Sequence, residues 1–300
     1  MSLVIVGSVA FDTIETPEAK RERVIGGACT YSAISASYFV KPYIVGVVGR
    51  DFTSKHFSIL HKKKIDTRGV KREDGKSFFW AGKYHQDMNN RDTLITELNV
   101  FEKFDPVLPP DYTQMPFLFL ANIDPPLQLK VLKAMKKLKF SMVDTMNLWI
   151  DIKRKELTEV FKNVDCVVLN DAEIRMYTGK SNLIEGAKAI QKTGPKYVII
   201  KKGEHGASIV GKKGEYFSCP SYPVEKLVDP TGAGDSFAGA FMGYAAKTGS
   251  VTFPVLKKAL VCGSAAASFT VEGFSIDKIY KASAAKIMAR TASIKKISSF

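Results

Sequence analysis

The chain has 300 residues, of which 45% are hydrophobic, so it can bury a substantial core in one large domain with an appendage or in two small domains. The net charge of +14 suggests an anionic partner, but the basic residues occur in scattered pairs and triplets, which argues against a nucleic-acid-binding stripe. The cysteines form no CxxC pair, which argues against a zinc site or a disulfide framework. No apolar run approaches the ~20 residues of a membrane span, so we expect a cytoplasmic protein without a membrane partner.

Short apolar runs typical of buried strands begin at residues 3–6. Further runs of this kind lie at residues 44–48, 117–120, 142–143, 166–169 and 197–200. Most are separated by stretches with helical spacing, such as 30–39 and 183–192, and the chain ends with a predicted helix at 276–288. Alternating strands and helices predict an α/β fold with a doubly wound, mostly parallel sheet flanked by helices.

Two segments, 13–24 and 67–101, interrupt this alternation. The second of them alternates polar and bulky residues between 77 and 84, which is typical of antiparallel strands. A structureless loop of that length is uncommon in a compact domain, so we predict that the two segments form a small β-sheet lid. The predicted α/β core then consists of residues 1–12, 25–66 and 102–300.

The most informative stretch runs from Thr231 to Asp235, just before a helix predicted from about residue 236 to 247. Free backbone N–H groups and the helix dipole make such a terminus a binding site for anions, phosphate above all. We predict that the N–H groups of Gly232, Ala233 and Gly234 hold charge that develops on a transferred phosphoryl group. Asp235 would orient and finally deprotonate the attacking hydroxyl. The alternative is that Asp235 only caps its helix.

Two further motifs follow predicted strands, at the sheet edge where open α/β sheets bind ligands. Asn170 and Glu173 could organise water-bound Mg²⁺ and ATP phosphates, or they could form an ordinary helix cap. Lys202, Gly203 and Gly206 follow the strand at 197–200 and could contact phosphate or nucleotide, or they could be a solvated turn.

Near the N-terminus, Asp12 follows the first strand, and Gly26 and Gly27 precede a predicted helix. A carboxylate that accepts hydroxyl groups and a glycine pair that lets a polyol approach the backbone suit a small hydroxylated substrate. A loop aspartate and a turn would explain each feature separately.

In combination, these motifs resemble those of the ribokinase family, also called the PfkB carbohydrate kinases. Residues 229–237, DPTGAGDSF, are similar to its C-terminal signature, Gly26 and Gly27 to its N-terminal signature, 170–173 to its NxxE motif, and 202–206 to its KGxxG turn. The resemblance spans nearly the whole chain. It implies an ATP-dependent, Mg²⁺-requiring kinase of an alcohol with Asp235 as the base.

The resemblance also assigns further positions. It implies that adenine lies between the segment ending at Val228 and the helix that carries Cys262 and Ala266. Asp229 and Thr231 match positions that bind an activating monovalent cation, such as K⁺, in some relatives.

The acceptor is less well defined by the resemblance. Tyr31 replaces an asparagine of the ribokinase signature and changes the predicted substrate pocket, and Asn147 follows another strand of the sheet. We expect phosphorylation of a hydroxymethyl group of a sugar or related alcohol. A nucleoside kinase of the same fold and a ligand-binding regulatory protein without catalysis are the alternatives, and either a monomer or a homodimer fits.

Overall fold

A computed structural model describes residues 1–299 of the chain. Nine strands form one large sheet in the order β13-β12-β11-β10-β9-β8-β1-β4-β5. Their bounds are β1 Leu3–Val6, β4 Pro42–Val48, β5 Asp66–Arg72, β8 Phe117–Leu120, β9 Phe140–Asp144, β10 Cys166–Asn170, β11 Tyr197–Lys201, β12 Ala207–Gly211 and β13 Tyr216–Cys219. The pairs from β5 to β11 are parallel, whereas β12 is antiparallel to both of its neighbours. The predicted mostly parallel sheet is confirmed.

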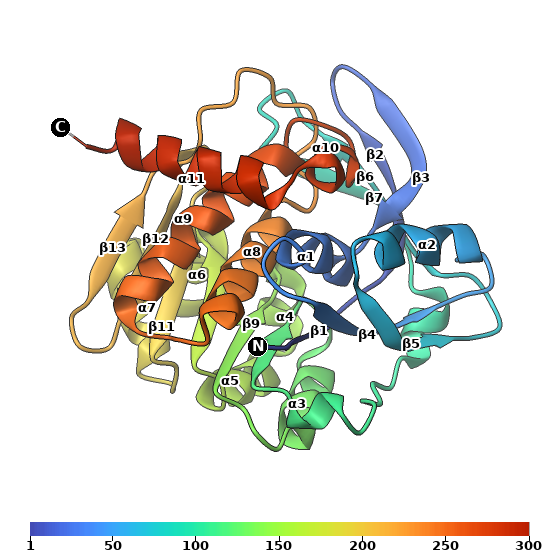
Figure 1. Cartoon of the computed structure of the whole chain (residues 1–300), viewed down its shortest axis with the longest axis horizontal. Coiled ribbons are helices and arrows are strands. Elements are labelled where there is room, and N and C mark those ends of the chain that lie inside the picture. The colour runs from blue at the N-terminus through green and yellow to red at the C-terminus, as the bar shows by residue number, and fades with distance from the viewer. Residues whose placement is uncertain (300) are drawn as a thin grey trace.

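Helices cover both faces of this sheet, as Figure 1 shows for the nearer one. The elements are α1 Ala28–Ala36, α2 Ser54–Lys62, α3 Pro125–Ala134, α4 Asn147–Ile152, α5 Arg154–Lys162, α6 Asp171–Thr178, α7 Leu183–Gln191, α8 Ala233–Thr248, α9 Phe253–Thr270, α10 Asp277–Lys281 and α11 Ala284–Ile297. Side chains that alternate along each strand divide between two cores. One core packs with α1, α8, α9 and α11, and the other packs with α3, α5, α6 and α7.

The C-terminal region differs from the prediction of one helix at 276–288. Two helices, α10 and α11, occupy this region and the residues that follow it. The Ser283 side chain accepts a hydrogen bond from the Lys286 N–H, so it caps the start of α11. The apolar spacing alone predicts one continuous helix, but Ser283 caps the start of a second one.

A second, smaller sheet contains four strands in the order β3-β2-β6-β7. These are β2 Ala10–Glu15, β3 Lys20–Gly26, β6 Phe78–Tyr84 and β7 Arg91–Glu97, and the β2–β3 hairpin projects at the upper right of Figure 1. The predicted start of the lid at residue 67 is wrong, because β5 pairs in parallel with β4 and extends the large sheet. The division of the chain into a core and a lid stays a prediction.

The carboxyl ends of neighbouring parallel strands bring three polar residues to one edge of the large sheet. Asn170 at the end of β10 pairs in register with Lys201 at the end of β11. Asp144 ends β9 on the other side of β10. Open α/β sheets bind their ligands at this edge, so these three residues mark a candidate binding site.

The close packing of α8 against α1 depends on glycine at position 239. A methyl group there would place its Cβ 2.1 Å from the Ser32 carbonyl oxygen. We expect Gly239→Ala to lower the free energy of unfolding by roughly 1–3 kcal/mol, as overpacked interiors do, measured by urea denaturation. Helix propensity alone predicts a gain of about 1 kcal/mol, so stabilisation would contradict this contact. Lys247→Ala, on an exposed position of the same helix, should change stability little.

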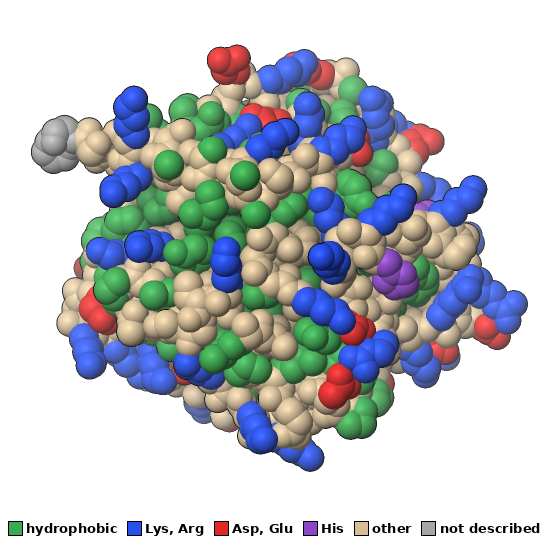
Figure 2. All heavy atoms as spheres, viewed as in Figure 1, with side chains coloured by type: hydrophobic (Ala, Val, Ile, Leu, Met, Phe, Trp, Pro, Cys, Tyr) green, Lys and Arg blue, Asp and Glu red, His purple; other side chains and the backbone are tan. Residues whose placement is uncertain are grey.

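Basic side chains are distributed over the molecular surface. In the view of Figure 2, Lys and Arg side chains are spread across the whole visible face. Among residues 1–299, no helix has both the length and the apolar character needed to span a bilayer.

Candidate active site

Helix α8 begins at Ala233, earlier than the predicted start near residue 236. Gly232 is the N-cap residue with φ of 75°, so Asp235 lies in the first helical turn. The Ala233 N–H donates to the Pro230 carbonyl oxygen at 3.1 Å, which removes it from the predicted group of anion-binding amides. Within residues 1–299, the N–H groups of Gly232, Gly234 and Asp235 have no protein acceptor. We call these three N–H groups the amide cradle.

The Asp235 carboxylate does not cap α8, so the helix-cap alternative is wrong. The carboxylate makes no hydrogen bond to any described residue, although the Asp235 backbone carbonyl accepts one from the Ser32 hydroxyl at 3.0 Å. The pKa of Asp235 is raised to about 7, mainly by burial and also by the Asp144 and Glu173 carboxylates, while the charges of Lys201 and Arg91 lower it. A half-buried carboxylate is therefore free beside the amide cradle.

Lys201, which the sequence analysis did not select, lies directly against this cradle. Its ammonium forms an ion pair with Asp144 at 2.8 Å, and both side chains are largely buried. A Cβ added to Gly234 would come 3.2 Å from Lys201 Nζ, so the ammonium lies over this glycine. Burial opposes the charge of Lys201, but Asp144 and Glu173 outweigh it and raise its pKa. The signal that could have identified Lys201 from sequence is its position at the end of a predicted strand, at the sheet edge where ligands bind.

Asn170 and Glu173 form a reciprocal helix cap, which is the structural alternative that their spacing left open. The Asn170 side chain accepts from the Glu173 N–H and the Glu173 carboxylate accepts from the Asn170 N–H, both at 2.7 Å. Burial raises the pKa of Glu173 to about 7, against the charge of Lys201. Capping occupies only one Glu173 oxygen, so the other could take a hydrogen bond from metal-bound water.

These residues fit Mg²⁺ only as part of a larger complex. Among the described residues 1–299, no group of three or more His, Cys, Asp or Glu side chains could bind a metal ion by itself. Mg²⁺ commonly keeps several waters and binds through one or two carboxylates plus substrate phosphates. The free oxygen of Glu173 suits that arrangement.

The predicted contacts at Lys202, Gly203 and Gly206 lie in a tight turn after β11. The Lys202 N–H donates to the Gly206 carbonyl oxygen, and both glycines have positive φ. The Lys202 ammonium donates to the Ser218 hydroxyl of β13 at 3.3 Å, whereas Lys201 points to the cradle. Contacts of this turn with a nucleotide stay a prediction.

Asp12 and the glycine pair lie together, and their contact with a substrate stays a prediction. A Cβ on Gly26 would overlap Asp12 Oδ2 at 1.9 Å, and one on Gly27, whose φ is 92°, would lie 2.4 Å from the Ser8 carbonyl oxygen. Both positions therefore require glycine. Burial raises the pKa of Asp12 to about 8, the carboxylates of Asp229 and Asp235 raise it too, and the Gly27 N–H lowers it.

Tyr31 lies beneath the amide cradle. Its ring would meet a Cβ on Gly232 at 2.4 Å, and its buried hydroxyl has no hydrogen-bond partner among the described residues. Burial and the nearby carboxylates of Asp12 and Asp229 raise the pKa of Tyr31.

Asp229 and Thr231 connect the cradle to its surroundings. The fully buried Asp229 carboxylate accepts N–H groups from Thr231 at 2.8 Å and from Ser275 at 3.0 Å. The Thr231 hydroxyl bonds to the Tyr84 hydroxyl of β6 at 3.0 Å and so links the small sheet to the cradle. A monovalent cation at these residues stays a prediction.

The segment that ends at Val228 meets the end of α9, because the Val228 N–H donates to the carbonyl oxygen of the α9 C-cap residue at 2.7 Å. Val228 packs with apolar residues of the small sheet. Cys262 and Ala266 are one turn apart on α9, and the Cys262 sulfur accepts a hydrogen bond from Thr291 of α11. The Cys262 sulfur therefore faces α11, and the adenine contacts at Cys262 and Ala266 stay a prediction. Asn147 is exposed at the start of α4.

Comparisons with known proteins identify the family of the chain. Residues 2–278 match the family described as pfkB family carbohydrate kinase. The chain belongs to the pfkB carbohydrate kinase family. It is an ATP-dependent kinase, as its relatives and its fold indicate.

Two curated kinases resemble the chain over most of its length. A cytidine kinase of Thermococcus kodakarensis is 32% identical over 81% of this chain and 87% of its own length. A nucleoside kinase of Methanocaldococcus jannaschii is 23% identical over 87% of this chain and 82% of its own length. Among solved structures, a ribokinase of Arabidopsis thaliana in complex with ribose and ATP has a TM-score of 0.77 at 19% identity, covering 96% of this chain and 98% of that one.

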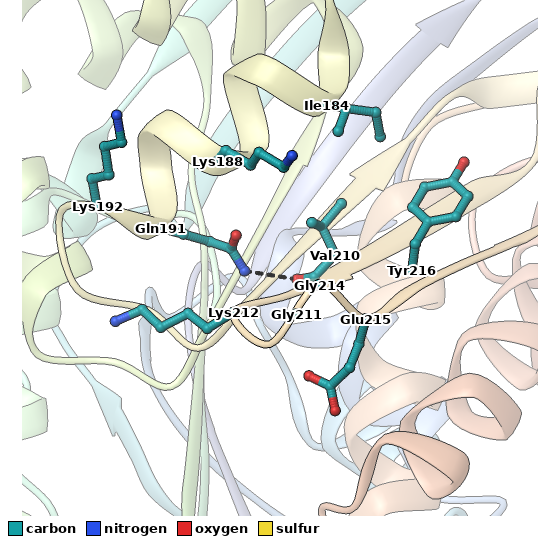
Figure 3. A pocket seen from close by; sticks show the side chains of 10 residues that line it. All are labelled: Ile184, Lys188, Gln191, Lys192, Val210, Gly211, Lys212, Gly214, Glu215 and Tyr216. Atoms are coloured by element: carbon teal, nitrogen blue, oxygen red, sulfur yellow. Dashed lines mark hydrogen bonds between the residues drawn. The ribbon is translucent and has the colours of Figure 1, made fainter.

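A separate groove of about 750 Å³ lies between α7 and the β12–β13 hairpin (Figure 3). Lys188 and Gln191 of α7 line it, opposite Val210 and Tyr216 of the hairpin. Gly211 in this groove pairs with Tyr197 at the start of β11, whereas Lys201 ends that strand. The groove therefore lies at the opposite edge of the kinase's large sheet from the amide cradle.

Proposed function

We propose that the protein transfers the γ-phosphate of ATP to the hydroxymethyl group of a nucleoside, with Asp235 as the catalytic base. The observation that supports this most directly is the free Asp235 carboxylate beside three free N–H groups. If Asp235 only capped the helix, its carboxylate would accept a backbone N–H. If the turn only bound an anion, the negative charge of Asp235 would weaken that binding.

The proposed chemistry follows from the positions of these groups. The amide cradle holds the negative charge on the transferred phosphoryl group, and Asp235 orients the acceptor hydroxyl in line with phosphorus. The hydroxyl becomes acidic as its oxygen bonds to phosphorus, so the carboxylate takes the proton late in the step. Mg²⁺, associated with Glu173 through water, would neutralise phosphate charge.

Two observations favour a nucleoside over a free sugar as the acceptor. The cytidine kinase and the nucleoside kinase named above align with more than four-fifths of this chain. Asp12, packed against Gly26, could accept hydrogen bonds from the hydroxyls of either acceptor and so does not decide between them. A tyrosine at position 31, where ribokinase has an asparagine, also argues against free ribose.

A panel of acceptors tests the proposal. Cytidine, other nucleosides, ribose, fructose and other sugars would each be incubated with ATP and Mg²⁺ while ADP release is recorded. We expect the highest kcat/KM with a nucleoside. A preference for a sugar would contradict the substrate class, and acceptor binding without any ADP release would favour a regulatory protein that has lost catalysis. Analytical ultracentrifugation of the same sample would distinguish a monomer from a homodimer.

The raised pKa of Asp235 predicts how activity depends on pH. With a pKa of about 7 in the free protein, this carboxyl is protonated at lower pH and cannot accept a proton. We expect kcat/KM for the acceptor to rise by about tenfold per pH unit on the acidic side and to level off above neutrality. The measurement is kcat/KM from about pH 5 to 9 at saturating MgATP. A profile that is flat below pH 6 would contradict a raised pKa in the base.

A further inference from the structure

The Lys201 ammonium is a buried cation with unused hydrogen-bonding capacity. A lysine ammonium has three N–H donors. Among residues 1–299, Asp144 Oδ2 is the one acceptor that Lys201 Nζ reaches. Its side chain is only 17% exposed, so the other donors have little access to water. Leaving buried donors unpaired costs free energy, which favours a ligand that supplies further acceptors.

The position of this ammonium indicates where such a ligand would lie. Lys201 Nζ lies over Gly234, whose N–H belongs to the amide cradle. Its charge also reaches Asp235, where it opposes the effect of burial on that carboxyl. The free donors of the lysine and of the cradle thus surround one place, next to the proposed base.

We infer that Lys201 binds the γ-phosphate of ATP, with Asp144 holding its ammonium over Gly234 until the nucleotide arrives. This inference rests on the proposed kinase function. Asp144 is 3% exposed and ends the strand two places from β11, so it can fix the ammonium without lying in the path of the acceptor. The phosphate oxygens would accept hydrogen bonds from the Lys201 N–H groups that Asp144 leaves unpaired.

The decisive comparison is between nucleotides with and without a γ-phosphate. Binding of the β,γ-imido analogue of ATP and of ADP, each with Mg²⁺, would be measured by calorimetry without any acceptor. We expect Lys201→Met to weaken binding of the triphosphate by about 10- to 100-fold more than binding of ADP, the range for a lost hydrogen bond to a charged group. Lys201→Arg, which keeps the charge, should recover part of this difference.

Two further variants separate this role from folding. Lys201→Met leaves Asp144 as an unpaired buried charge, which could destabilise the protein. The double variant Lys201→Met with Asp144→Asn removes that charge, and we expect it to show the same selective loss of triphosphate binding. Lys196→Met is the matched control, because Lys196 also pairs with an aspartate, Asp165 at 3.0 Å, but lies at the opposite end of β11 from Lys201. It should leave both affinities unchanged.

The possible results distinguish the inference from the function on which it rests. Equal weakening of ADP and the triphosphate in Lys201→Met, or recovery of triphosphate binding in the double variant, would show a structural role and overturn the inference alone. If the wild-type protein binds neither nucleotide, the proposed function fails together with the inference. The inference is supported if Lys201→Met and the double variant both lose triphosphate binding selectively while Lys196→Met binds both nucleotides normally.

Discussion

Asp235→Asn lowers kcat by at least roughly a hundredfold and leaves ATP binding nearly unchanged, if the carboxylate is the base. The amide is close to isosteric with the carboxylate, but it cannot take the proton that the acceptor hydroxyl loses. The carboxylate makes no hydrogen bond to a described residue, so the exchange breaks no contact within the protein. The measurements are kcat with the best acceptor of the panel and the dissociation constant of MgATP.

Asp277→Asn is the control for this experiment. Asp277 also lies in the first turn of a helix, α10, and it is exposed. Its replacement removes the same charge from a helix N-terminus, where an acidic side chain contributes about 0.3–1 kcal/mol to stability, but should not affect turnover. Near-normal kcat in Asp235→Asn, with a change in melting temperature similar to that of Asp277→Asn, would remove Asp235 from the mechanism.

Gly232→Ala should reduce kcat on the order of a hundredfold, the effect of losing one donor to a developing negative charge. The positive φ of Gly232 disfavours any other residue, and the added Cβ would lie 2.4 Å from the Tyr31 ring. Either effect moves the first turn of α8 and its free N–H groups. We expect a rise in KM for ATP together with the lower kcat, because the cradle acts on bound nucleotide as well as on the transition state.

A second variant separates steric overlap from backbone strain. Combining Gly232→Ala with Tyr31→Ala removes the ring that the methyl group would meet. If overlap is the main cause, the double variant recovers part of the ATP affinity compared with Gly232→Ala. Wild-type kinetics in Gly232→Ala would contradict the role of this turn.

Some parts of the site were predictable from sequence because local rules determine them. The helix start close to the glycines, the cradle N–H groups of Gly232 and Gly234, and the Asn170–Glu173 cap depend on residues a few positions apart, and their spacing is visible in the chain. The fold followed from the alternation of strands and helices. The lid boundary at 67 was wrong because a half-exposed edge strand such as β5 lacks the continuous apolar run of a central strand.

Other parts depend on which way a side chain points. Lys201 and Lys202 are adjacent lysines, but Lys201 is the last residue of β11 and Lys202 belongs to the turn that follows, and only Lys201 reaches Asp144. Cys262 was placed at the adenine because it lies on the expected helix, although its sulfur faces Thr291. The pairing of Thr231 with Tyr84 joins residues 147 positions apart, which no local pattern indicates.

The contact between Tyr31 and Gly232 has a consequence for changes of substrate. The residue at position 31 belongs to the predicted acceptor pocket, and the same ring supports the turn that carries the cradle. A substitution that enlarges the pocket from this side would also loosen the phosphate-binding turn, so a gain in substrate range would reduce the rate of chemistry. New acceptor preferences would therefore arise more easily through side chains of the small β-sheet other than Tyr84, which bonds to Thr231 of the turn.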